Sequence, residues 1–135
     1  MVKINFPIVA DIKGKVSRKY GMLHKAANST RDVRGVFIID PDNIVQAINF
    51  YPMNIGRNMD EVTRMVTALQ LSQKENVLTP ANWKEGNDIL VPHKPYYTND
   101  LIENPDLKNQ FYNVGDYMWY KKSKQSIPKD NKEKK

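Results

Sequence analysis

The sequence predicts an α/β fold, and a hairpin near the middle of the chain carries that prediction. Gly35 to Ile39 and Ile44 to Tyr51 are runs of β-branched and aromatic residues, which favour strands. Between them stands Asp-Pro-Asp-Asn, where proline presets φ and Asn43 tolerates a left-handed backbone. A tight turn should therefore join the two runs as antiparallel strands.

The stretch that follows the second strand predicts a helix of about 14 residues, beginning after Asn58. Asn58 and Glu61 have the spacing of an N-cap residue and the carboxylate of a capping box. We expect the apolar stripe of this helix to pack on the hairpin, and Asp60, Glu61 and Arg64 to form an ordinary solvated face. The stripe recurs at helical spacing: Met59, Val62, Met65, Val66 and Leu69.

The residues before the hairpin predict a strand, a short helix and a loop. Ile4 to Ala10 is apolar but contains Pro7, which suits an edge strand or the start of a strand. Lys15 to Tyr20 predicts a helix that ends at Gly21. His24 to Asp32 is polar and predicts a loop.

The last third of the sequence is irregular in pattern. Only Ile89 to Val91 predicts a short strand there. Tyr96 to Tyr120 holds five of the seven tyrosines, without helical or alternating period, and predicts an extension that wraps over another surface. Residues 121–135 hold seven lysines and two acidic residues, so this basic tail carries +5 of the chain's net charge of +6. Such a tail predicts disorder.

Composition excludes several kinds of function. The 135 residues include no cysteine, so the chain has no disulfide and no cysteine nucleophile. His24 and His93 are isolated, and no cofactor or metal constellation is expected. We expect no nucleic-acid partner, because no aromatic residue is interleaved with the tail lysines. No apolar run approaches the ~20 residues that span a membrane, and we expect a cytoplasmic protein.

Two arginines mark the candidate site. Arg34 precedes the first strand and Arg57 follows the second, so antiparallel pairing places both near the open end of the hairpin. Guanidinium groups beside an apolar hairpin suggest a pocket for an anion or a thiolate. Without further support, an arginine flanking a strand is an ion-pair or surface residue in most proteins.

The residues of this region resemble a known family. RGVFIIDPDNIVQAINFYPMNIGRNMDEVTRMVTALQ resembles the second half of a peroxiredoxin, and NFPIVADIKGKVSRKYGML resembles the strand, turn and helix before it. LQLSQKENVLTPANWKEGNDILVP is similar to the C-terminal domain of one-cysteine and related long peroxiredoxins. The resemblance covers residues 4–95. It implies a partial thioredoxin-like fold over residues 1–72 and a peroxiredoxin C-terminal domain over 73–120, before the tail.

The resemblance also implies a function. In peroxiredoxins, a cysteine thiolate attacks the peroxide, and an arginine stabilises the thiolate and the negative charge on the leaving oxygen. Arg34 matches that arginine, and Arg57 matches a second one near the same site. The family's Pro-x-x-x-Thr/Ser-x-x-Cys motif precedes everything that matches here, so this chain alone should be inactive. The intact enzyme would use an external thiol to reduce the sulfenic acid.

The resemblance further implies partners. Peroxiredoxin dimers pair the strand that matches Ile44–Tyr51 edge to edge, and this strand carries no charge that would protect a free edge. The family fold places two central strands between Ile4–Ala10 and the hairpin, so the isolated chain should aggregate, swap with a copy of itself or be partly molten. The alternative function is a non-catalytic module that pairs with a full-length peroxiredoxin.

Overall fold

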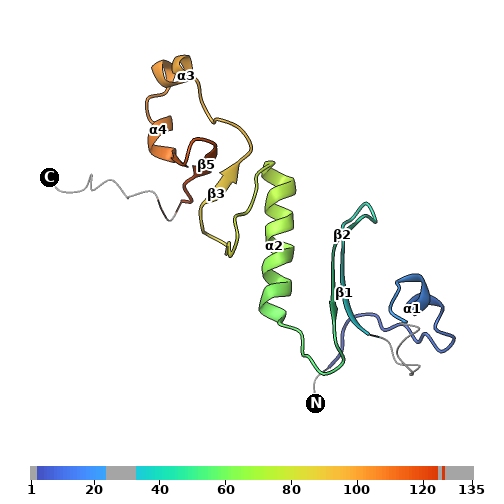
Figure 1. The fold of residues 1–135 in the computed structure, drawn as a ribbon. Helices are drawn as coiled ribbons and strands as arrows, with labels where there is room; N and C mark the ends of the chain where they lie inside the picture. Colours follow the sequence, from blue (N-terminus) through green and yellow to red (C-terminus); the bar gives the residue numbers. More distant parts are fainter. Residues whose placement is uncertain (1–2, 24–32, 125, 127–135) are drawn as a thin grey trace. The chain divides into compact units, whose positions relative to one another are not determined.

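The computed structural model describes residues 3–23, 33–124 and 126, which form two compact units, Met1–Arg57 and Asn58–Lys135 (Figure 1). Each unit is described here by itself. The predicted loop His24–Asp32, apart from its bounds in sequence, and most of the predicted tail lie outside the described residues. The predicted domain boundary at residues 72–73 stays a prediction.

The first unit contains the predicted hairpin. Strand β1 (Arg34–Ile39) pairs antiparallel with β2 (Val45–Tyr51), with Arg34 opposite Tyr51 and a bulge at Ile39 (Figure 1). The turn closes through the Asp40 carboxylate, which accepts from the backbone N–H of Ile44 at 2.8 Å. Asn43 has φ of 64°, the left-handed conformation that the sequence predicts. The hairpin prediction is therefore confirmed.

A short helix covers part of one hairpin face. Helix α1 (Lys15–Lys19) begins beyond Asp11, whose carboxylate accepts from the backbone of Ser17 at 2.8 Å and from its hydroxyl at 2.9 Å. The ring of Tyr20, just after the helix, meets Phe37 of β1 edge-on with ring centres 4.8 Å apart. Phe37 meets Phe50 of β2 in the same way at 5.6 Å. This aromatic contact fixes α1 against the hairpin.

The predicted strand Ile4–Ala10 is wrong. Residues 3–10 are extended but have neither helix nor strand, and no backbone hydrogen bond joins them to another described residue. A strand exists only where a second strand accepts its backbone groups, and this segment has none here. Apolar composition therefore predicted an extended backbone correctly, and its pairing incorrectly.

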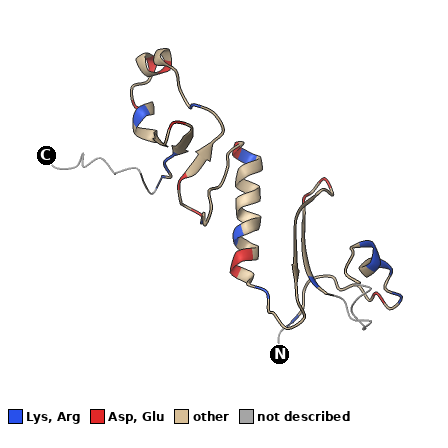
Figure 2. Ribbon diagram, in the orientation of Figure 1, with Lys and Arg blue, Asp and Glu red and all other residues tan. Residues whose placement is uncertain are grey.

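The second unit begins with the predicted helix. Helix α2 (Met59–Glu75) is capped by Asn58, whose side-chain oxygen accepts from the N–H of Asp60 at 3.0 Å and of Glu61 at 3.3 Å. The N-cap prediction is confirmed, although the helix is longer than expected and ends at Asn76, which has φ of 51°. Acidic residues lie at its first turn and a lysine in its last, which complements the helix dipole (Figure 2).

The region after α2 is a small α/β arrangement. Its three strands form an antiparallel sheet in the order β3-β5-β4, with both helices between β3 and β4 in sequence. The elements are β3 (Ile89–Val91), α3 (Thr98–Glu103), α4 (Leu107–Gln110), β4 (Phe111–Val114) and β5 (Met118–Lys121). The strand prediction at Ile89–Val91 is confirmed.

The prediction that Tyr96 to Tyr120 lacks regular structure is wrong. Four elements form there, and its aromatics pair with one another: Tyr112 stacks on Tyr120 at 5.1 Å, and Tyr96 meets Trp119 edge-on at 5.6 Å. Elements of four to six residues are too short for a periodic signal, and cross-strand aromatic pairs stabilise them instead.

The core of the second unit lies where α2 meets the loop before β3. Trp83, the most buried of its residues at 2% exposure, is surrounded by apolar side chains from the helix, the loop and the strand. These are Ala68, Val77 and Ile89, with Leu71 and Val91 at the margin. The predicted packing of the helix on the hairpin concerns two separately described units, and it stays a prediction.

Candidate functional site

Arg34 lies at the open end of the hairpin, as the sequence predicts. It is the first residue of β1 and stands opposite Tyr51, the last residue of β2. Its guanidinium donates a hydrogen bond from Nη1 to the carbonyl oxygen of Ile55, at 3.1 Å. This bond ties the start of β1 to the loop that follows β2. The other guanidinium N–H groups remain for an anion, because arginine has five donors.

Arg57 lies two residues beyond Ile55, at the end of the same loop. The loop folds back on itself, since the N–H of Ile55 donates to the carbonyl of Pro52 at 3.1 Å. Arg57 is exposed. The structure therefore attaches Arg34 to the loop that carries Arg57. Which anion these two arginines share, and their catalytic roles, stay predictions.

The hairpin leaves apolar side chains exposed. Its sheet has only two strands, so each strand has an edge that no described strand pairs. Val45, Ile48 and Phe50 of β2 are each nearly half exposed. A free, uncharged, apolar edge favours pairing with another chain, which supports the predicted use of Ile44–Tyr51 in dimers without testing it.

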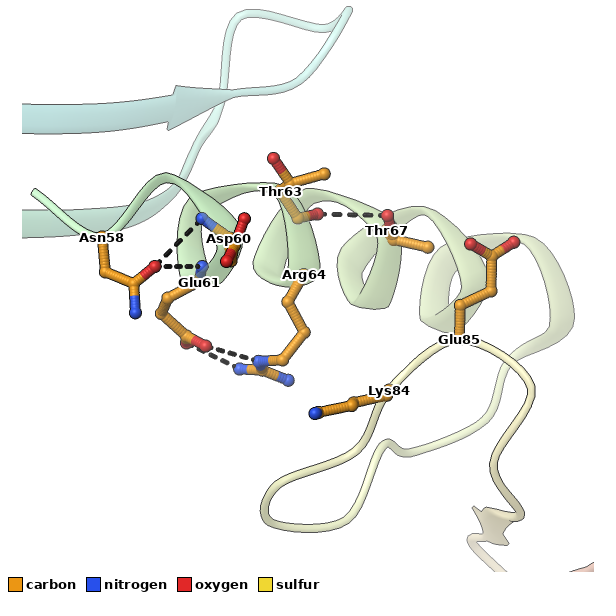
Figure 3. A pocket seen from close by; sticks show the side chains of 8 residues that line it. All are labelled: Asn58, Asp60, Glu61, Thr63, Arg64, Thr67, Lys84 and Glu85. Carbon is orange, nitrogen blue, oxygen red and sulfur yellow. Dashed lines mark hydrogen bonds and ion pairs between the residues drawn. The ribbon is translucent and has the colours of Figure 1, made fainter.

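The predicted solvated face of α2 is wrong for two of its three residues. Glu61 and Arg64 form a two-bond ion pair, with Nε to Oε2 at 2.6 Å and Nη2 to Oε1 at 2.8 Å (Figure 3). The same guanidinium donates from Nη1 to the backbone carbonyl of Trp83, at 3.2 Å. Arg64 thus connects α2 to the loop that holds the core tryptophan. The glutamate–arginine spacing of three was the signal for this pair.

A hollow of about 600 Å³ opens beside this pair, and Asn58, Asp60, Lys84 and Glu85 are among the residues that line it (Figure 3). The hydrogen bond from Arg64 holds the pKa of Glu61 below its ordinary value, against a small opposing effect of desolvation. Its mixed charges favour no particular ligand.

Asp88 is a second polar centre that the sequence analysis missed. Its carboxylate accepts hydrogen bonds from the backbone N–H of Ser123 at 2.7 Å, the hydroxyl of Ser126 at 2.7 Å and the phenol of Tyr112 at 3.1 Å. Burial alone raises the pKa of Asp88, but these hydrogen bonds outweigh it and the pKa lies below its ordinary value. No local sequence signal could have found these partners, because the nearest is 24 residues away.

Neither a metal nor a membrane site is found in the described part of the chain. No three histidine, cysteine or acidic side chains cluster there in a way that would hold a metal ion. Within the same residues, no helix has the length and apolar character needed to cross a bilayer.

Two family models match this sequence. The AhpC/TSA family matches residues 2–48, which include α1, β1 and the start of β2. The C-terminal domain of 1-Cys peroxiredoxin matches residues 68–101, which include most of the Trp83 core. These two matches follow each other along the chain as the resemblance of its motifs predicts.

Curated relatives and solved structures agree. A peroxiredoxin of Methanosarcina mazei is 47% identical over 91 residues, covering 67% of this chain and 42% of the relative. Peroxiredoxin 2 of Caldanaerobacter subterraneus is 42% identical over 122 residues, covering 88% and 52%. A structure of a yeast mitochondrial 1-Cys peroxiredoxin has a TM-score of 0.63 at 36% identity, covering 82% of this chain and 53% of that one. A mutant of peroxiredoxin 6 of Arenicola marina gives 0.69 at 28% identity, covering 93% and 60%.

The fold and these matches define the class as the thioredoxin-like thiol peroxidases. This chain belongs to the AhpC/TSA peroxiredoxin family and carries the C-terminal domain of its 1-Cys members. The predicted family and the predicted mixed α/β, partial peroxiredoxin fold are confirmed. The chain spans about half the length of the curated relatives that it matches, and it contains no cysteine.

Proposed function

We propose that this chain supplies the arginine side of a peroxiredoxin peroxide site, with Arg34 as the principal residue and Arg57 as the second. The cysteine thiolate of that site must come from residues outside this sequence, because none of the 135 residues is cysteine. The substrates are hydrogen peroxide and organic hydroperoxides. The chain alone is inactive as a peroxidase.

The chemistry explains why arginine is needed. The thiolate sulfur attacks the nearer peroxide oxygen, the O–O bond breaks, and negative charge moves onto the departing oxygen, which takes up a proton as water or an alcohol. The sulfur becomes a sulfenic acid, which an external thiol reduces. Arginine favours the thiolate and stabilises the departing oxygen, and its planar fork reaches both peroxide oxygens at once.

The bond between Arg34 and the Ile55 carbonyl is the single observation that supports this proposal best. It orients the guanidinium along the open end of the hairpin and leaves donors free for a substrate. A side chain as long as arginine is otherwise mobile, and pre-orientation is what makes a donor effective in a transition state.

Complementation in trans tests the proposal. This chain is mixed with an N-terminal peroxiredoxin half that holds the Pro-x-x-x-Thr-x-x-Cys motif, and peroxide consumption is measured with a thiol reductant. We expect activity only in the mixture, together with a more cooperative unfolding transition. Turnover by the pure chain, or an active mixture that tolerates Arg34→Met, contradicts the proposal.

The free hairpin edge favours a second candidate, a non-catalytic module that pairs with a full-length peroxiredoxin. In that case the chain binds the intact enzyme but restores nothing to the isolated N-terminal half. Co-sedimentation with each of the two partners distinguishes the candidates, because a catalytic half requires the complementary half and the module requires the whole enzyme.

A further inference from the structure

The N-terminal segment Ile4–Ile12 is the largest apolar feature of the first unit without a packing partner among the described residues. Exposure of its apolar side chains ranges from 57% at Ile4 to 94% at Ile12. The backbone at residues 3–10 is extended and makes no backbone hydrogen bond to another described residue. A soluble chain rarely leaves such a run open to water.

The outer edge of β1 is the matching vacancy in the same unit. The sheet order β1-β2 leaves this edge unpaired by any described strand, and Gly35 to Ile39 carries no charge that would prevent pairing. Beside it, Tyr20, Phe37 and Ile48 line an apolar hollow of about 440 Å³ on the α1 face of the hairpin. We propose that Ile4–Ala10 of a second copy of this chain pairs with β1, by reciprocal exchange between the two copies.

The pattern of the segment fits one-sided pairing. Ile4, Phe6 and Ile8 alternate with Asn5 and Pro7, so the three large apolar side chains share one face of an extended strand. In a strand, the backbone groups of alternate residues point to the same edge. Pro7 lacks an N–H and belongs to the outward set, so Ile4, Phe6 and Ile8 present their backbone groups to β1. The proline then closes the far edge against further strands.

A second copy is the occupant because the chain holds both halves of the contact. Each copy presents one segment and one edge, so a two-fold exchange satisfies both at once and closes the assembly. The charges agree, since neither Ile4–Ala10 nor Gly35–Ile39 contains an ionisable side chain. This contact differs from the predicted pairing of β2 with its copy, which uses the opposite edge of the hairpin, and it does not depend on peroxide chemistry.

Sedimentation velocity tests the exchange, in an Ala47→Lys background that blocks the β2 edge. We expect the Ala47→Lys protein to remain dimeric, and the added Phe6→Asp to reduce it to a monomer of 15.7 kDa. Ile12→Asp is the matched control: it places the same charge on a more exposed residue beyond the pairing stretch, and the dimer should persist. A monomeric Ala47→Lys protein, or a dimer that survives Phe6→Asp, overturns the proposal.

Cross-linking provides a second test that does not depend on the stability of those variants. Because the chain has no cysteine, a single one can be introduced on either side of the contact. One copy carries Ile8→Cys, and a second, differently tagged copy carries Val36→Cys, Phe37→Cys or Ile38→Cys in turn. Mild oxidation should join the two tags at one register, whereas Ile12→Cys should not. No mixed disulfide at any register, or equal yields at all of them, overturns the proposal.

Discussion

Arg64 donates a hydrogen bond to the backbone carbonyl of Trp83 across 19 residues of sequence, at 3.2 Å. The tryptophan is held from its other end as well, since its indole N–H donates to the carbonyl of Asn87 at 3.2 Å. A core residue and its loop are thus fixed by polar bonds on both sides. This arrangement makes the second unit dependent on a few residues of the TPANWKEG segment.

The first prediction concerns Trp83. Trp83→Ala should destabilise the second unit by about 3–5 kcal/mol, because it opens a cavity at the most buried residue of that unit, and Trp83→Phe should cost less. Urea unfolding followed by circular dichroism measures the difference. Trp119→Phe serves as the control, since that ring lies at a half-exposed strand. A free energy of unfolding for Trp83→Ala that matches the wild type would contradict the packing described here.

The second prediction separates the two roles of Arg64. Glu61→Gln removes the charge of the ion pair and leaves the bond to Trp83, whereas Arg64→Met removes both. We expect Arg64→Met to lower the urea midpoint more than Glu61→Gln, and its effect to persist in high salt, which screens only the ionic part. Lys84→Met, beside the same hollow, is the control and should leave the midpoint unchanged. Equal effects of the two substitutions would refute the role assigned to the Trp83 carbonyl.

The third prediction is a dependence of stability on pH. Since the folded pKa of Asp88 lies below the unfolded value near 3.8, the stability that its hydrogen bonds provide is present above that value and is lost as pH falls through the folded pKa. Burial and Asp88 raise the pKa of Tyr112, so its contribution is lost when pH rises above about 10.

Asp88→Asn checks this assignment. Unfolding midpoints across pH 2–6 should show a smaller acid-induced decrease in the variant than in the wild type. Asp106→Asn is the control, because this residue caps α4 without a side-chain hydrogen bond to the helix backbone. An unchanged acid limb in Asp88→Asn would remove Asp88 from the account.

The fourth prediction concerns the proposed active site. In the complemented enzyme, Arg34→Lys should lower kcat/KM by about 10²–10³-fold, because lysine keeps the charge but loses the fork that contacts both oxygens. Arg57→Lys should cost less, since it matches the second arginine. Arg18→Lys, in α1, is the control. A peroxidase that is indifferent to Arg34→Lys while sensitive to Arg57→Lys would reverse the two roles.

The fifth prediction concerns the dimer that the family resemblance implies. Ala47 lies at the middle of β2, opposite Ile38. In the complemented enzyme, Ala47→Lys should shift sedimentation toward the monomer, since a lysine on an edge strand opposes edge-to-edge pairing. Asp42→Lys, in the turn, adds a similar charge away from the edge and should have no effect. Unchanged sedimentation of Ala47→Lys would refute the assignment of this edge.

The local elements could be predicted wherever one stretch of sequence contains all of the interactions that form them. The hairpin follows from two β-branched runs and a turn in which Asn43 adopts φ of 64°, and the start of α2 follows from the cap at Asn58. The position of Arg34 at the open end of the hairpin follows in turn from antiparallel register. The family could be recognised for the same reason, because its motifs are contiguous.

Only the tertiary structure decided the interactions between distant residues. Ile4–Ala10 has the composition of a strand, yet pairing depends on a partner that composition does not specify. The short strands β4 and β5 have no period of their own and form through cross-strand contacts such as Tyr112 on Tyr120. Arg64 and Asp88 were assigned to a solvated surface or left out, because their partners lie 19 to 38 residues away. Local sequence determines backbone preference, whereas the free energy of burial and pairing, which selects among the possible contacts, is a property of the folded chain.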